Sequence, residues 1–442
     1  MRITSIDIIK QLRAAGHQAY WAGGCVRDML LGIKPKDFDI VTSAKPDEIE
    51  DLLEHTVPIG KQFGVILAIQ NEQHFEVATF RSDAGYSDGR RPDAVLFTNA
   101  EEDAKRRDFT INALFYDPLT DKILDYVEGQ KDLDAKLIRF IGNPVERIKE
   151  DHLRLLRAVR FKNVYKFQYH PETYKAVKDN IHLLKQVSPE RLRDELNKML
   201  ISQNRVEALE DMEDLGILEL LLPEIQALKG LAQPLMYHQE GDVFDHTMAC
   251  LKAMPEGKPP TLYWAVMLHD SGKALTFSVD EERIRYDGHA EASAEIARKV
   301  LKRLNFSSRE IKKVAWLCEQ HMSVFNVLTM PEKARLKWFK KEWFLDLLAL
   351  HKYDALGITP QDHSCYQAIR QLYSKQMADQ PLEIKPFLTG EELMHELKLK
   401  PGPEVGRLLE ELTDLQLAGE VKTKIQAYAW LKKQVKIAPS QL

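Results

Sequence analysis

The chain has 442 residues, of which 44% are hydrophobic and 29% charged, and its formal net charge is −5. It is too long for one hydrophobic core and should form about two to four domains. No run approaches the roughly 18 apolar residues of a membrane span, the N-terminus lacks a signal-peptide core, and the four cysteines have no CxxC spacing. These features exclude a membrane partner and a disulfide framework, and they predict a cytoplasmic globular protein with free thiols.

Residues 1–140 combine short β-prone runs with helical ones. The β-prone runs are "FGVILAIQ" (63–70), "HFEVATF" (74–80), "AVLFT" (94–98) and "KILDYV" (122–127), and "PDEIEDLLEH" (46–55) has helical periodicity. The segment therefore predicts an α/β N-terminal domain with a small mixed or antiparallel sheet.

Two motifs in this domain point to phosphate and metal binding. "GGCVRDMLLG" (23–32) contains a glycine turn entering a helix, whose amides and Arg27 could hold a phosphate, although a glycine pair alone is more often structural. "PKDFDIVTS" (35–43) places Asp37 and Asp39 two residues apart in a β-prone stretch. On a strand both carboxylates point to one face, where they repel unless a cation such as Mg²⁺ lies between them. Together the motifs indicate phosphate held near metal ions, as in two-metal nucleotidyl transfer.

Residues 141–230 have the periodicity of consecutive amphipathic helices. The clearest runs are "ERIKEDHLRLLRAVRFKNVYK" (146–166) and "SPERLRDELNKMLIS" (188–202), and strands are expected to stop after "IRFIGNP" (138–144). Residues 134–205 contain 16 Lys and Arg against 9 Asp and Glu. This local charge fits a polyanion-binding surface or a solvated helical surface equally well.

A carboxylate and three arginines recur every three residues within the first of these runs. Asp151, Arg154, Arg157 and Arg160 should therefore lie with their neighbours on one helical face. A carboxylate acceptor beside a planar guanidinium donor can satisfy the hydrogen-bonding edge of cytosine or adenine. The alternative is an exposed salt bridge worth well under about 1 kcal/mol.

Further stretches accompany these motifs in a fixed order. They are "EEDAKRRDFTINALFYDP" (101–118), "DYVEGQKDL" (125–133) and "EDHLRLLRAVRF" (150–161). With them the chain resembles the class II tRNA nucleotidyltransferase and bacterial poly(A) polymerase family through most of its length. The resemblance implies template-independent addition of nucleotides, from CTP and ATP and with Mg²⁺, to an RNA 3′ end. It also implies a nucleotidyltransferase head over 1–140 and an all-α nucleotide-selecting neck over 141–230.

The resemblance assigns roles to individual residues. Asp37 and Asp39 match the family's catalytic, metal-binding carboxylates. The residues that match its nucleotide contacts are Gly24, Arg27, Arg107, Asp151, Arg154, Arg157 and Arg160. Among them, Asp151 and Arg154 match the pair that reads the incoming base.

A second set of metal-ligating residue types lies within 231–380. Its members are His246, His269, Asp270, His289, His321 and Asp354. An adjacent His-Asp pair with histidines on both sides is the pattern of an HD-type metal phosphohydrolase domain, and imidazole with carboxylate suits Mn²⁺, Fe²⁺, Ni²⁺ or Zn²⁺. Some members of the resembled family carry such a domain with phosphatase or cyclic-phosphodiesterase activity. A hydrolytic and a purely structural role for these residues are both open.

Residues 381–442 are expected to form a charged helical tail after a proline-containing connector. The tail resembles the C-terminal portion of family members with an HD domain, which implies tRNA binding. A plain helical interaction module would have the same pattern.

Three functions are compatible with these patterns. The first is CCA addition to the tRNA 3′ end. The second, with the same chemistry, is addition of the terminal A alone or of poly(A), and the third is an HD phosphohydrolase with a non-catalytic head. The pair Asp37 and Asp39 argues against the third. Residues 84–95, "AGYSDGRRPDAV", resemble the flexible loop that the family associates with A addition, which argues against a CC-only enzyme.

Overall fold

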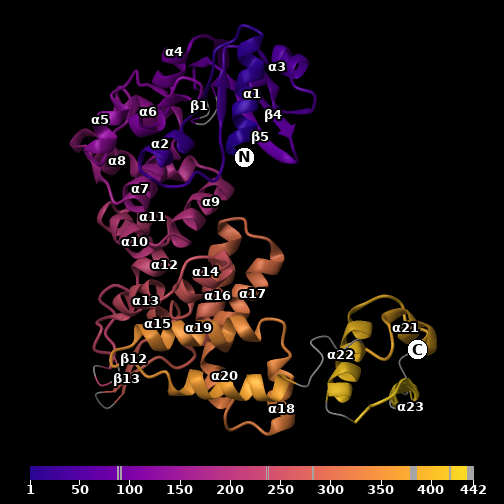
Figure 1. The fold of residues 1–442 in the computed structure, drawn as a ribbon. Coiled ribbons are helices and arrows are strands. Elements are labelled where there is room, and N and C mark those ends of the chain that lie inside the picture. The colour runs from indigo at the N-terminus through magenta and orange to yellow at the C-terminus, as the bar shows by residue number, and fades with distance from the viewer. Residues whose placement is uncertain are drawn as a thin grey trace. The chain divides into compact units, whose positions relative to one another are not determined.

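The computed structural model describes the chain except residues 87–88, 90–91, 235, 237, 281–282, 379–385, 418–419 and 436–442. The chain forms two compact units. Unit 1 comprises Met1–Gln226 and Lys302–Phe306, and unit 2 comprises Ala227–Leu301 and Ser307–Leu442. Figure 1 shows that unit 1 begins with a sheet and continues as helices, whereas unit 2 consists mainly of helices.

A seven-stranded sheet lies at the centre of the first half of unit 1. In spatial order its strands are β3 (Thr56–Gly60), β4 (Val65–Gln70), β5 (Gln73–Thr79), β2 (Ile40–Thr42), β1 (Ala19–Ala22), β8 (Phe115–Asp117) and β9 (Lys122–Leu124). Neighbouring strands are antiparallel except β2 and β5, which are parallel. The predicted α/β domain with a small mixed sheet is therefore confirmed. The run 94–98 pairs outside this sheet, where β7 (Ala94–Phe97) joins β6 (Arg81–Ala84) in a two-stranded ribbon.

Helix α1 (Arg2–Ala14) packs against β1 and β2 through its apolar stripe. Ile8, Ile9 and Leu12 are fully buried, and Trp21 Nε1 on β1 donates to Ser5 Oγ at 3.0 Å. A second cluster, which includes Tyr20, Val41, Phe80, Ala104 and Phe115, joins the sheet to α4 (Ala100–Lys105). Burial of these side chains fixes the strand ends that carry Asp37 and Asp39.

The remaining helices of unit 1 surround and follow the sheet. They are α2 (Gly24–Leu30), α3 (Pro46–Leu52), α5 (Gly129–Asp134), α6 (Pro144–Glu150), α7 (Arg154–Tyr165), α8 (Pro171–Asn180), α9 (Pro189–Leu200), α10 (Arg205–Asp214), α11 (Ile217–Leu221) and α12 (Pro223–Gln226). The helices expected at 46–55 and 188–202 correspond to α3 and α9. Both begin at a proline in the first turn, where the missing N–H costs no hydrogen bond.

Two details of the helical segment differ from the prediction. The expected continuous helix over 146–166 is broken between α6 and α7, because Asp151 is extended (φ −147°, ψ 103°) and its Oδ1 accepts a hydrogen bond from Leu153 N at 3.1 Å. Such side-chain-to-backbone bonds compete with helix continuation. Strands also continue past residue 144, since β10 (Leu137–Ile138) pairs in parallel with β11 (Gln168–Tyr169).

Unit 2 is built around a buried helix. Its helices are α13 (Val243–Lys252), α14 (Pro260–Leu268), α15 (Lys273–Thr276), α16 (His289–Arg303), α17 (Ser308–Gln320), α18 (Glu332–Phe339), α19 (Phe344–Gly357) and α20 (Ser364–Met377), and β12 (Ser278–Asp280) pairs with β13 (Arg283–Arg285). Every side chain from Thr261 to Leu268 on α14 is buried, and α13, α17 and α19 pack against this helix. The three surrounding helices thereby bring together residues that are about 100 positions apart in the sequence.

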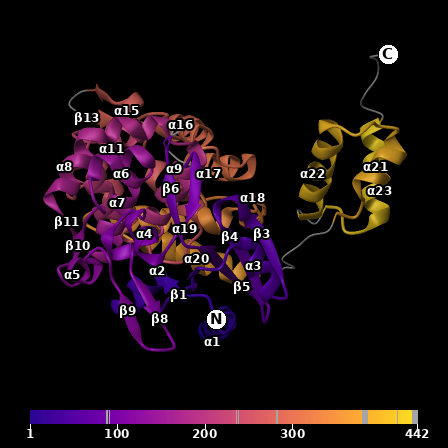
Figure 2. The same ribbon diagram turned by 90° about the horizontal axis from the view of Figure 1, so that it is seen from above.

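The C-terminal helices have a core of their own. Figure 2 shows α21 (Gly390–Leu397), α22 (Pro403–Leu417) and α23 (Lys424–Val435) as one group, held together by Leu393, Leu412 and Leu431 among others. The expected boundary between residues 380 and 381 lies outside the described residues. Across the described ranges, the helices lack the combination of length and apolar character that crossing a membrane requires.

Gly357 at the end of α19 allows this helix to approach α13 closely. A Cβ at this position would lie 2.3 Å from Cys250 Sγ and 2.9 Å from Cys250 N. Gly357→Ala should therefore lower the free energy of unfolding by about 1–3 kcal/mol, because the two helices would be overpacked. Gly406→Ala on α22 is the control, since no atom lies within 4 Å of its Cβ position. Urea unfolding of the full chain measures the stability of both variants. Equal unfolding midpoints for Gly357→Ala and Gly406→Ala would contradict the close approach of α13 and α19.

Candidate functional site

Asp37 and Asp39 lie in the extended segment that leads into β2. Ala22 N donates to Asp39 O at 3.0 Å, which extends the β1–β2 ladder back to Asp39. Phe38 and Ile40 are buried, whereas Asp37 is exposed and Asp39 is partly exposed. Because side chains alternate along an extended chain, both carboxylates emerge on the face opposite the two apolar side chains.

A third carboxylate, Glu76, adjoins this pair. Ile40 on β2 is in register with Val77 on β5, so Asp39 and Glu76 precede the paired residues on parallel strands. Burial, together with repulsion from Asp37 and Glu76, raises the pKa of Asp39 to about 6, and Arg107 opposes this shift. The three carboxylates therefore form an acidic group that a cation would stabilise.

Arg107 lies between this acidic group and the glycine turn. Gly23 has a φ of +71°, and a Cβ there would lie 3.0 Å from Arg107 Nη1, so glycine both makes the turn and leaves room for the guanidinium. The Nε and Nη2 atoms of Arg107 donate to Asp103 Oδ2 at 3.2 and 3.0 Å. Gly24 begins α2, which has only seven residues. The side chain of Arg107 is therefore better placed than a helix dipole to attract phosphate.

Arg27 links α2 to the helices that follow the sheet. It is 5% exposed, its Nη1 donates to Asn112 Oδ1 at 2.5 Å, and its guanidinium lies 4.4 Å from the ring centre of Tyr165. Asn112 Nδ2 in turn donates to Asp108 Oδ1 at 3.0 Å, and Asp108 Oδ2 accepts from Arg157 Nε at 2.8 Å. Burial alone would raise the pKa of Asp108, but Arg157 and its other partners hold it well below the usual range. A continuous chain of hydrogen bonds thus joins Arg27 to Arg157.

The four residues expected on one helical face do not all lie on one helix. Arg154, Arg157 and Arg160 lie on α7, whereas Asp151 precedes that helix. Asp151 Oδ2 accepts a hydrogen bond from Arg191 Nη2 at 2.8 Å. The prediction of one face was wrong for Asp151, because this residue ends α6 instead of continuing it.

Arg154 and Arg160 have separate acidic partners. Arg154 Nη1 donates to Glu150 Oε2 at 2.5 Å, and Arg160 Nε donates to Glu195 Oε2 at 2.5 Å. Arg154 is 8% exposed and also donates to the backbone oxygen of Arg106. In this structure Asp151 and Arg154 therefore each engage a different charged side chain of unit 1.

The structure adds residues that the sequence analysis did not identify. Glu76 alternates with buried Phe75 and Val77 in "HFEVATF", and this alternation was a usable signal for an acid on the exposed face of the strand. Asp103 is fully buried and binds both Arg106 and Arg107. Its spacing from the two arginines, three and four residues along a helix, was a second signal.

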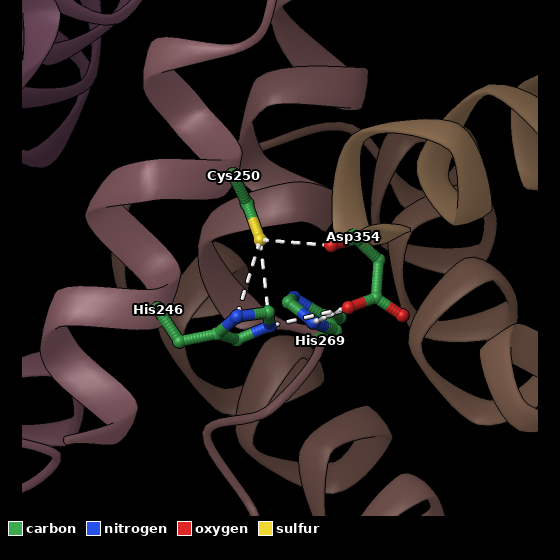
Figure 3. Close-up of side chains that lie close together, drawn as sticks. All are labelled: His246, Cys250, His269 and Asp354. Atoms are coloured by element: carbon green, nitrogen blue, oxygen red, sulfur yellow. Dashed lines mark hydrogen bonds and ion pairs between the residues drawn. The ribbon is translucent and has the colours of Figure 1, made fainter. Parts of the chain in front are cut away.

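The six metal-ligating candidates of unit 2 lie together in the structure. His246 Nε2 lies 3.1 Å from Asp354 Oδ1 and 3.7 Å from Asp270 Oδ2, and His269 Nε2 lies 3.7 and 3.5 Å from the same two atoms. We call His246, His269 and Asp354 subsite 1 (Figure 3). The residues come from α13, the end of α14 and α19.

The other oxygen of Asp270 faces a second group. Asp270 Oδ1 lies 3.5 Å from His289 Nε2 and 3.7 Å from His321 Nε2, and these two nitrogens are 3.2 Å apart. We call His289 and His321 subsite 2. Asp270 is 3% exposed and lies between the two subsites, with one oxygen toward each.

Every imidazole in the cluster is oriented by a hydrogen bond at Nδ1. The Nδ1 atoms of His269, His289 and His321 lie 2.6–2.8 Å from backbone oxygens, and Nδ1 of His246 lies 3.1 Å from Glu240 Oε1. This leaves each Nε2 directed into the cluster, which is the usual arrangement of metal-binding histidines.

Two features of the cluster suit a metal, although nearby Cys250 and Asp354 raise the pKa of His246 and nearby Asp270 raises that of His269. His269 Nε2 is buried without a hydrogen-bond partner, which a bound cation would supply. Burial and the nearby His269 lower the pKa of His321 to about 4, so its imidazole is neutral at pH 7 and able to bind a metal. Lys273 Nζ lies 2.7 Å from Asp270 Oδ2 and is a further polar residue that the sequence analysis did not identify.

Family models match three parts of the chain. Residues 19–139 match the poly(A) polymerase head domain, residues 166–229 match the probable RNA and SrmB-binding site of polymerase A, and residues 289–430 match the putative domain 2 of tRNA nucleotidyltransferase. The first match contains Gly24, Asp37, Asp39 and Arg107.

Curated relatives are similar over part of their length. The chain is 39% identical to the CCA-adding enzyme of Lactobacillus johnsonii over 251 residues, which are 57% of this chain and 62% of that protein. It is 43% identical to the CCA-adding enzyme of Ligilactobacillus salivarius over 211 residues, which are 48% of this chain and 52% of that protein. The alignments thus span less than two thirds of these relatives.

Solved structures match nearly the whole chain. The Bacillus stearothermophilus CCA-adding enzyme in complex with CTP has a TM-score of 0.64 at 25% identity, covering 98% of this chain and 97% of that chain. The Thermotoga maritima CCA-adding enzyme complexed with tRNA has a TM-score of 0.53 at 21% identity, covering 97% and 94%, and supports the fold alone. On the agreement of these family models, relatives and structures, the chain belongs to the class II tRNA nucleotidyltransferase and poly(A) polymerase family.

Proposed function

We propose that the protein adds CCA to the 3′ end of tRNA, using CTP and ATP and without a template. The observation that carries this proposal is the convergence of Asp37, Asp39 and Glu76 beside Arg107 and the Gly23 turn. The relatives named as CCA-adding enzymes support the choice of tRNA and of these nucleotides.

Each part of the head has a distinct task in this reaction. Asp37 and Asp39, with Glu76 beside them, would hold Mg²⁺, whose chemistry there would be to activate the tRNA 3′-hydroxyl and stabilise the leaving pyrophosphate. The 3′ oxygen bonds to the α-phosphorus as the bond to pyrophosphate breaks, and the hydroxyl proton passes to solvent. Arg107, fixed by Asp103, neutralises triphosphate charge, and Arg27 holds the glycine turn against α7.

Base selection is assigned to Asp151 and Arg154. Both groups engage other side chains, Arg191 and Glu150, in the structure without nucleotide. We propose that an incoming base exchanges with these partners, so that carboxylate and guanidinium read its Watson–Crick edge. The exchange costs little net energy, because one charge-assisted hydrogen bond replaces another.

The same chemistry would serve an enzyme that adds only the terminal A or makes poly(A). Residues 87–88 and 90–91 of the loop 84–95 lie outside the described residues, but Gly89 O accepts a hydrogen bond from His152 N at 3.3 Å. The loop thus contacts the residue next to Asp151. We assign the tail over 381–442 to tRNA binding and the protein to the cytoplasm, where its substrates and its four free thiols belong.

An incorporation assay separates these activities. Purified protein receives tRNA ending before CCA, or tRNA ending in CC, with CTP, ATP or both. CCA addition predicts extension of the first tRNA by three nucleotides, whereas refusal of CTP would replace this function with A-only or poly(A) addition.

Asp37→Ala and Asp39→Ala should each lower the incorporation rate by at least about 1,000-fold, because the cation loses a ligand at the reacting atoms. Asp51→Ala on α3, an exposed carboxylate outside the site, is the control and should retain the wild-type rate. Near-normal incorporation by either site variant would contradict the metal assignment.

The second candidate function belongs to the histidine cluster. We propose that subsites 1 and 2, with Asp270 between them, would hold transition metal, from among Mn²⁺, Fe²⁺, Ni²⁺ and Zn²⁺, in an HD-type phosphohydrolase domain over 231–380. Bound metals would polarise a phosphoryl oxygen and supply hydroxide for phosphomonoester or cyclic-phosphate hydrolysis. The orphaned His269 Nε2 and the four oriented imidazoles support this proposal.

A double substitution tests the cluster apart from the head. His269→Ala with Asp270→Ala should remove all transition metal, measured by mass spectrometry of the purified protein, and any hydrolysis of bis(p-nitrophenyl) phosphate. It should leave CTP incorporation within about twofold of wild type, because the head has its own ligands. His351→Ala, a buried histidine that packs against Phe325, should keep the metal. Unchanged metal content in the double variant would refute metal binding by the histidine cluster.

The raised pKa of Asp39 makes the stability of the metal-free head depend on pH. The pKa of Asp39 is about 6 in the folded protein and near 3.9 in the unfolded chain, so folding favours the protonated carboxyl. The stability that this group contributes is therefore lost as the pH rises from about 4 through about 6. Asp39→Asn should therefore raise the free energy of unfolding of the metal-free protein by at most about 3 kcal/mol at about pH 7.5, which raises its Tm. Near pH 4 the substitution should leave the Tm unchanged. Calorimetry of chelator-treated protein measures this. If the Tm of Asp39→Asn equals that of wild type at every pH, Asp39 does not make the stability depend on pH.

A further inference from the structure

A cysteine lies next to subsite 1. Cys250 is one helical turn after His246 on α13, and both side chains are fully buried. The ligating atoms of His246, Cys250, His269 and Asp354 all lie within 4.8 Å of one another. Figure 3 shows the four side chains directed toward one space.

The thiol lies beside the His246 ring, close to both ring nitrogens. Cys250 Sγ is 3.4 Å from Nε2 and 3.8 Å from Nδ1. Nδ1 is already bound by Glu240, so Nε2 is the nitrogen left for a metal. Metal bonds of 2.0–2.3 Å in a tetrahedron separate the donor atoms by roughly 3.3–3.6 Å. The Sγ–Nε2 distance falls in this range. Because Sγ lies beside the ring, the thiol must turn toward the Nε2 lone pair to share its ion.

The packing of α19 holds the thiol in this position. Gly357 lies so close that a Cβ there would meet Sγ at 2.3 Å, and Sγ is 3.9 Å from the backbone oxygen of Asp354. The same helix thus carries a ligand of subsite 1 and confines the sulfur beside it. Another buried thiol of unit 2, that of Cys318, lies 3.8 Å from Ala265 O and belongs to none of the ligand groups found among the described residues.

We propose that Cys250 binds the metal of subsite 1 as a thiolate, completing a His-His-Asp-Cys set that selects Zn²⁺. This inference rests on the proposed metal centre. Thiolate is a soft ligand that favours zinc over Mg²⁺ and Mn²⁺, and imidazole, carboxylate and thiolate are all ligand types that zinc takes. Among the described residues, the group formed by subsite 2 and Asp270 has no sulfur ligand. The two subsites therefore differ in metal preference, with the more thiophilic ion in subsite 1.

Cobalt substitution tests the sulfur ligand directly. The full chain is stripped of metal with a chelator and titrated with Co²⁺, and the near-ultraviolet absorption is recorded. Wild type should develop a thiolate-to-cobalt charge-transfer band at the first equivalent. Cys250→Ser should still bind Co²⁺ but lack this band. Its Zn²⁺ affinity should fall at least about 10- to 100-fold, because removal of a residue that only hydrogen-bonds a metal ligand already costs that much. Cys318→Ser is the matched control and should keep both the band and the affinity.

The outcomes separate this inference from the metal centre itself. Cobalt binding by wild type without the band, or a band that persists in Cys250→Ser, overturns the sulfur ligand and leaves the centre intact. No cobalt uptake by wild type overturns both. If Cys250→Ser fails to fold, X-ray absorption of zinc-loaded wild type decides, since a Zn–S distance of about 2.3 Å is expected and its absence refutes the ligand.

Discussion

Repulsion between carboxylates that share one face of a sheet is the constraint on which the head depends. Burial, together with repulsion from Asp37 and Glu76, raises the pKa of Asp39, and a counter-charge lowers this cost. Arg107 supplies part of the counter-charge, and it is held in place by Asp103, which is fully buried and also binds Arg106. A residue that contacts no substrate therefore determines where positive charge stands beside the acidic group.

The histidine cluster combines two carboxylates, Asp270 and Asp354, with four imidazoles. Each imidazole must present the correct nitrogen. Backbone oxygens achieve this for His269, His289 and His321, and Glu240 achieves it for His246. Orientation by Nδ1 explains how helices can build the cluster from residues far apart in sequence, since each helix fixes its own imidazole locally.

Much of this arrangement could be predicted from local patterns, because local physics produces it. The strands at 63–70 and 74–80 and the helix at 188–202 follow from periodicity and a proline start signal. The break at Asp151 could not be found in this way, since an apolar period of 3.6 continues across it and only the bond from Leu153 N to the side chain ends α6. Glu240 and Cys250 were also missed. The contact of Glu240 with His246 comes from the chain before α13, which no periodicity encodes. Cys250 lies one turn after His246 on α13, so its i,i+4 spacing was a usable signal.

The surplus of basic residues over 134–205 has a specific distribution. Several arginines of this region are bound internally: Arg157 by Asp108, Arg160 by Glu195 and Arg191 by Asp151. Lysines such as Lys166 and Lys185 are exposed instead.

Arginine and lysine side chains therefore act differently in this region. Planar, half-buried guanidinium groups with fixed partners orient the residues assigned to the nucleotide, whereas exposed ammonium groups provide charge without direction. A polyanion attracted by the lysines would bind with strong dependence on salt, and the arginines would contribute selectivity rather than attraction. The basic surplus over 134–205 thus consists of arginines with internal partners and of exposed lysines.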